Sequence, residues 1–93
     1  MFWRFTAFIE GLDEFSDQQT DALYEAGCSD GTLASGGGRA WIRFARVAPS
    51  LQSAISSAIA HIRATGLAVD HVEIDQDALA PAAVAQWGEL THA

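Results

Sequence analysis

The first ten residues alternate between two chemical faces and are rich in aromatic and β-branched side chains. One face gathers Trp3, Phe5, Ala7 and Ile9, and the other carries Arg4, Thr6 and Phe8. A period of two is typical of a strand with one buried face. We therefore expect a half-buried strand from Trp3 to Glu10, which Gly11 and Asp13 bring to an end.

The next segment changes to the spacing of a helix. Ser16 followed by Gln19 matches a capping box, in which each side chain satisfies a free amide of the first helical turn. Apolar residues recur at helical spacing at Phe15, Ala22, Leu23 and Ala26. Gly27 can adopt the left-handed conformation that terminates helices. These signals predict a helix from about Asp17 to Ala26.

A glycine-rich turn then separates two short strand patterns. The first runs from Thr32 to Ser35, and Gly36–Gly38 forms the turn. In the second, the apolar residues Ala40, Ile42 and Phe44 alternate with Trp41, Arg43 and Ala45. This arrangement predicts a β-hairpin.

The most regular helical pattern begins at Pro49 and Ser50 and ends at Gly66. Its apolar stripe consists of Leu51, Ala54, Ile55, Ala58, Ile59 and Ile62. A strand from Ala68 to Ile74 follows, with Val72 and Ile74 as expected core contacts. The pattern indicates a short last helix over residues 82–87.

The predicted order of elements is β-α-β-β-α-β, followed by a short helix. Two crossover helices around a central hairpin are typical of a ferredoxin-like βαββαβ sandwich, in which two helices cover one face of a four-stranded antiparallel sheet. The predicted fold class is therefore α+β. We expect a ferredoxin-like domain over residues 1–77 and a short helical tail over residues 78–93.

This fold leaves one face of the sheet without helices. By alternation that face carries Arg4, Thr6, Phe8, Trp41, Arg43, Ala45, Val69, His71 and Glu73. Large apolar side chains that gather on a surface often mark contact with a partner, a second copy or a ligand. The predicted interaction surface comprises Arg4, Phe8, Trp41, Arg43 and His71.

Charge and composition restrict the function classes. Twelve carboxylates oppose five arginines and no lysine, and the net charge of −7 disfavours free-standing nucleic-acid binding. The aromatic and arginine residues of the uncovered face resemble the platform of RNA-binding sheets, but the glycine-aromatic signature of those sheets is missing. No apolar run is long enough to span a membrane. Because Cys28 has no second cysteine to pair with, a reduced compartment, the cytoplasm, is the expected location.

No cluster in the sequence predicts catalysis, a metal site or a cofactor. Cys28 has no neighbouring histidine to activate it and is expected to pack in the core. His61 and His71 lack the spacing of a metal site on one helix or beside paired cysteines. The acidic positions 73, 75 and 77 lack the glycine and final glutamate of a calcium loop. Gly36–Gly38 does not precede a helix, as phosphate-binding glycines do.

Three runs of sequence carry a resemblance: LYEAGCSDGT at 23–32, FARVAPSL at 44–51 and SSAI at 56–59. They are similar to a bacterial, actinobacterial-type family of small helix-turn-helix proteins, over roughly residues 5–86. The resemblance implies a helix-turn-helix at the C-terminal end, and Val84, Ala85 and Gln86 resemble the start of its first helix. Gly88 and Glu89 depart from the expected Leu-Gly, and we expect no recognition helix within these 93 residues. Since DNA binding needs that second helix, DNA is not an expected partner of this chain alone.

The resemblance and the uncovered face together favour a non-enzymatic protein-interaction or dimerisation domain of a bacterial regulator-like or antitoxin-like protein. A homodimer or a partner protein is the expected assembly. Two alternatives stay open. One is a small-molecule-binding regulatory module with its ligand near Trp3, Arg46 or Cys28. The other is a small enzyme of the same fold, which needs a convergent acid, base and anion donor that the sequence does not place on one loop.

Overall fold

The computed structural model describes residues 1–74, which form six elements of secondary structure. In chain order these are β1 (Phe2–Ile9), α1 (Asp17–Ala26), β2 (Gly31–Gly36), β3 (Arg39–Val47), α2 (Leu51–Ala64) and β4 (Val69–Ile74). The predicted β-α-β-β-α-β order is confirmed. The predicted helix at 82–87 and the helical tail at 78–93 lie outside the described residues.

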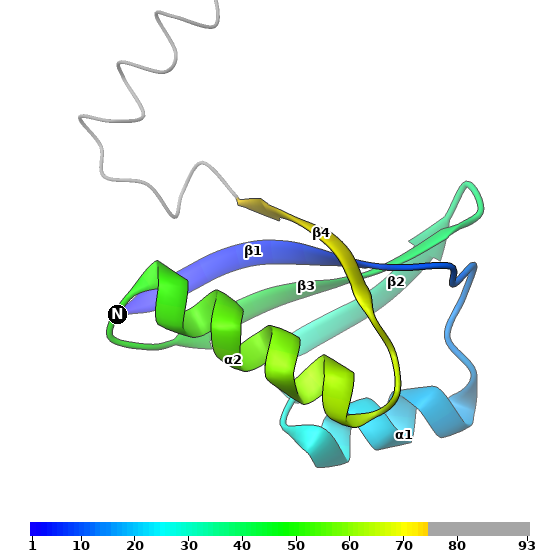
Figure 1. Ribbon diagram of the computed structural model, residues 1–93, viewed down its shortest axis with the longest axis horizontal. Helices are drawn as coiled ribbons and strands as arrows, with labels where there is room; N and C mark the ends of the chain where they lie inside the picture. Colours follow the sequence, from blue (N-terminus) through cyan, green and yellow to red (C-terminus); the bar gives the residue numbers. More distant parts are fainter. Residues whose placement is uncertain (75–93) are drawn as a thin grey trace, which may run out of the picture.

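The four strands form one antiparallel sheet in the order β2-β3-β1-β4. β1 and β3 are its central strands, and β2 and β4 are its edges. Figure 1 shows α1 and α2 on the same side of the sheet, with the other side uncovered. The α+β class and the four-stranded antiparallel sheet are thus confirmed.

Helix α1 has the limits that its capping residues predict. The Ser16 Oγ accepts a hydrogen bond from the Gln19 backbone N–H at 3.1 Å, and the Gln19 Oε1 accepts one from the Ser16 N–H at 2.9 Å. This pair satisfies two amides that have no partner within the helix. Gly27 ends the helix with a φ of 117°, a conformation that favours glycine.

The hairpin between β2 and β3 turns at Gly37 and Gly38. Both residues have positive φ, 59° and 77°, as a two-residue turn between right-twisted strands requires. Gly36 belongs to β2 and pairs with Arg39. The strand that the sequence predicts from Thr32 therefore extends by one residue at each end.

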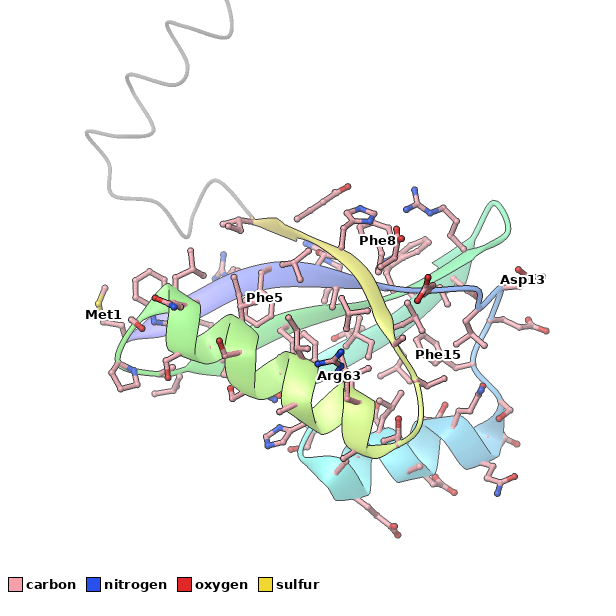
Figure 2. All side chains as sticks on the ribbon, in the orientation of Figure 1. Met1, Phe5, Phe8, Asp13, Phe15 and Arg63 are labelled. Atoms are coloured by element: carbon pink, nitrogen blue, oxygen red, sulfur yellow. The ribbon has the colours of Figure 1, made fainter. Side chains whose placement is uncertain are left out.

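The core lies between the sheet and the two helices. Phe5 and Phe44 stack across β1 and β3 with ring centroids 5.2 Å apart. Figure 2 shows Phe5 directed towards the helices and Phe8 on the opposite side of the sheet. The buried core consists of Phe5, Ala7, Ile9, Leu23, Cys28, Ile42, Phe44, Ala54, Ala58 and Ile62. The predicted burial of Cys28 is confirmed.

A β-bulge in β4 corrects the predicted alternation of this strand. His71 pairs with Phe8 and Val69 pairs with Ile9, so Asp70 is an extra residue with no partner on β1. Val69 therefore returns to the helix side and packs against the core, and its predicted place on the uncovered face is wrong. Val72 packs against the core as expected. Ile74 keeps 47% of its surface exposed, so its predicted core contact is wrong.

Candidate functional site

The sheet surface that faces away from the helices is the candidate site, and we call it the open face. Because successive strand residues point to opposite sides, it is formed by the positions that alternate with the core residues. β1 contributes Phe2, Arg4, Thr6 and Phe8, and β3 contributes Arg39, Trp41, Arg43, Ala45 and Val47. β4 contributes His71 and Glu73, and β2 contributes Thr32, Ala34 and Gly36.

Three rings lie side by side across the open face. The Phe8 ring is central, with its centroid 5.8 Å from that of Trp41 and 4.6 Å from that of His71. The Phe8 and His71 rings are nearly parallel, at 8°. A Cβ added at Gly36 would lie 3.5 Å from the Trp41 indole, an ordinary van der Waals contact, so Gly36 is the β2 neighbour of this ring. The three rings are half-buried and are held by strands, which makes them a preorganised surface.

Charged groups surround the ring row. The Arg39 guanidinium lies 4.6 Å from the Phe8 ring centroid, and its Nη2 is 4.0 Å from the Asp70 Oδ2. The His71 ring has a carboxylate at each nitrogen: Asp70 at 2.7 Å from Nδ1 and Glu73 at 3.3 Å from Nε2. The hydrogen bond to Asp70, and after it the one to Glu73, raises the pKa of His71 above its ordinary value. Both ring nitrogens donate when the imidazole is charged.

The predicted interaction residues all lie on the open face, but they do not form one cluster. Phe8, Trp41 and His71 occupy the ring row. Arg43 pairs with Thr6, in the next row of residues across the strands. It is exposed, and within residues 1–74 it forms no ion pair. Arg4 lies one row further, opposite Ala45.

Among the charged residues around the ring row, Arg39 and Asp70 were not predicted. Arg39 precedes Trp41 by two residues on β3, so alternation alone would have placed it on the open face. By alternation the Asp70 side chain should point to the helix side. The bulge instead lets its carboxylate lie beside the His71 ring. No residue type in this segment marks a bulge in advance.

A second polar cluster lies on the helix side of the sheet and centres on Arg46. Its Nε and Nη2 donate to the two oxygens of Asp30 at 2.7 and 2.9 Å. Nη2 also donates to the Gly27 carbonyl at 2.8 Å, and Nη1 donates to the Ser57 hydroxyl at 2.9 Å. The His61 Nδ1 lies 3.3 Å from Nη1. Arg46 thus joins β3 to both helices, and its side chain is only 7% exposed.

The Arg46 cluster bears on the ligand-binding alternative. A hollow of about 470 Å³ beside it is lined by Arg46, Asp30, Ser57 and His61 among others. These polar groups are already bonded to one another. Trp3 donates its indole N–H to the Ala48 carbonyl at 3.0 Å. These residues therefore offer a ligand few unused donors.

Cys28 offers little reactivity in its present surroundings. Burial raises the pKa of its thiol, and this effect outweighs the opposing charge of Arg46. Its side chain has no exposed surface. A neutral, buried thiol is a poor nucleophile, and the role that this environment supports is packing.

Residues 1–74 show neither a metal-binding cluster nor a membrane-spanning helix. This part of the chain contains no group of three or more histidine, cysteine or acidic residues that could hold a metal ion. None of its helices is both long and apolar enough to cross a membrane. Comparison with known protein families, curated proteins and solved structures gives no significant match. The similarity to helix-turn-helix proteins therefore stays a prediction.

Proposed function

We propose that this chain is a non-enzymatic protein-interaction and dimerisation domain with a ferredoxin-like fold, and that the open face is its contact surface. The central strands β3 and β1 and the edge strand β4 present the ring row of Trp41, Phe8 and His71 without a covering helix. This partly exposed row is the observation that carries the proposal, because aromatic residues at the centre of a surface usually dominate interface energies.

Apolar surface at the far end of the same face adds support. Phe2 and Val47 pair across β1 and β3, and they keep 57% and 73% of their surfaces exposed. Between this pair and the ring row lie the arginines at positions 4 and 43. Arginine and aromatic side chains are enriched in protein interfaces, whereas lysine is depleted.

The biological setting forms a further part of the proposal. The sequence similarity to small helix-turn-helix proteins supports a role as the association domain of a bacterial regulator or antitoxin-like protein. Association through the open face needs neither a cofactor nor a metal. It also leaves the helix side, with its saturated Arg46 cluster, free of any direct role in contact.

Sedimentation velocity of the wild type and of Trp41→Asp tests the proposal. The wild type should associate as its concentration rises, and Trp41→Asp should shift it towards the monomer because a carboxylate replaces the largest ring of the surface. Tyr24→Asp is the matched control: Tyr24 is 46% exposed on α1, on the other side of the molecule. If wild type and Trp41→Asp are equally monomeric, the proposal is wrong.

A further inference from the structure

The charges of the open face are sorted by strand. Arg39 and Arg43 are on β3, whereas Asp70 and Glu73 are on β4. β1 lies between these two strands and contributes no carboxylate to the face. The face therefore has a basic side and an acidic side, with β1 as the boundary.

The basic and acidic sides meet within a single row of neighbouring residues across the strands. In one row, Arg43 of β3, Thr6 of β1 and Glu73 of β4 are neighbours. In the next row, Trp41 and His71 take the two outer positions around Phe8. Thr6 has a short side chain and is almost fully buried, at 9% exposure, so the longer neighbours on either side project beyond it. Each row thus has one group on β3 and a different group on β4, and these two groups could pair across an interface.

We propose that the occupant of the open face is a second copy of this chain, related to the first by a two-fold axis that runs along β1. This inference rests on the proposed function and names its partner. Rotation about such an axis places β3 of one subunit over β4 of the other. Arg43 then meets the partner's Glu73, Arg39 meets the partner's Asp70, and each contact occurs twice.

The alternative two-fold axis in the plane of the interface runs across the strands. It would place β3 over β3 and β4 over β4, which brings the arginines of the two subunits together and the carboxylates together. Like charges opposed across an interface are unfavourable and act against that arrangement. The sorting of charge by strand therefore favours the axis along β1 over an axis across the strands.

The ring row becomes the centre of this contact. Phe8 lies next to the axis and meets its own copy, while Trp41 meets the partner's His71. When it is protonated, an imidazole over an indole makes a favourable contact. Arg4 is also on β1 and approaches its own copy, so that end of the face is the less favourable one. The result is an apolar centre with charged groups around it, as in protein interfaces generally.

The area of the open face determines how strong the dimerisation should be. Eight residues of strand extend about 26 Å, and the three strands that overlap about an axis along β1 span about 14 Å, which gives roughly 370 Å² in projection. Specific complexes bury about 800 Å² on each partner. A face of this size predicts a weak, concentration-dependent dimer, so association must be followed from micromolar to near-millimolar protein.

Charge reversal in two separate variants tests the axis. Arg43→Glu places Glu opposite Glu73 of the partner subunit, and Glu73→Arg places Arg opposite the partner's Arg43. Each variant alone should dimerise at least about tenfold more weakly than the wild type. An equimolar mixture of the two restores both pairs in a heterodimer and should recover association to within about threefold of the wild type. Arg63→Glu on α2 is the control reversal, and it should leave association unchanged.

The outcomes separate this inference from the function on which it rests. Recovery in the mixture also shows that both variants are folded, and far-ultraviolet circular dichroism checks each one alone. If Trp41→Asp dissociates the dimer but the charge variants associate like the wild type, the axis is wrong and the proposed function stands. The same holds if the single variants lose association and their mixture does not regain it. A wild type that is monomeric at every concentration overturns both.

Discussion

The two faces of the sheet carry the same set of four residue types in opposite surroundings. On the helix side Arg46 lies 5.0 Å from the Phe44 ring, with Asp30 and His61 beside it. On the open face Arg39 lies 4.6 Å from the Phe8 ring, with Asp70 and His71 nearby. The side chain of Arg46 is 7% exposed, whereas that of Arg39 is 54% exposed.

The difference lies in how completely each arginine is bonded. Arg46 and Asp30 form two hydrogen bonds, whereas Arg39 and Asp70 approach only to 4.0 Å. A buried guanidinium must have its donors satisfied, and a solvated one need not. The first cluster therefore holds the fold together. The second has charges that remain available to another molecule.

Matched arginine substitutions should separate the two clusters most strongly. Arg46→Met leaves the Asp30 carboxylate and the Gly27 carbonyl without their partner and should lower the free energy of unfolding by about 2–4 kcal/mol. Arg39→Met removes an exposed pair and should change it by less than about 0.5 kcal/mol. Urea denaturation of both variants measures the contrast. Equal effects would show that burial does not distinguish the clusters.

The loss of stability at acid pH should depend on the Arg46 cluster. Burial raises the pKa of Asp30, but the hydrogen bond and the charge of Arg46 together outweigh it, so the pKa lies below its ordinary value. A lowered folded pKa contributes stability above the unfolded pKa of about 3.9, and this contribution is lost as the pH falls through the folded value. Asp30→Asn should flatten the fall in stability below about pH 4, and Asp70→Asn should leave it nearly unchanged. The melting temperatures of the wild type and both variants between pH 2 and 6 test this prediction.

The smallest effect is expected at His71. Its pKa is raised chiefly by the hydrogen bond to Asp70, so the associated stability is fully present below the unfolded pKa of about 6.5 and is lost as the pH rises through the folded value. Asp70→Asn should lower the pKa of His71, which an NMR titration of its ring protons follows. Because the pair is solvated, the melting temperature should hardly move. An unchanged pKa in the variant would rule out the Asp70 contact in solution.

Local signals in the sequence predicted most of the fold. Ser16 and Gln19 defined the start of α1, and alternation assigned Phe5 and Phe8 to opposite faces of β1. These features depend on neighbours within a few residues. For this reason the element order and the main residues of the open face were accessible in advance.

The two polar clusters were less accessible because their partners are distant in sequence. Arg46 meets Asp30, Ser57 and His61, which belong to separate segments, and only the packing of both helices brings them together. Asp70 reaches the open face through an irregularity in strand pairing. Periodicity predicts which face a residue lies on, but it does not predict bulges or bonds between distant segments.

The central claim is that the open face contacts a second copy of the chain in solution. Amide spectra of isotope-labelled protein, recorded over a dilution series, test it residue by residue. The claim predicts that the amide chemical shifts change with concentration mainly at Phe8, Trp41, Arg43, His71 and Glu73, and that those of α1 and α2 do not change. Shifts confined to the helices, or spectra that do not change with concentration, would contradict it.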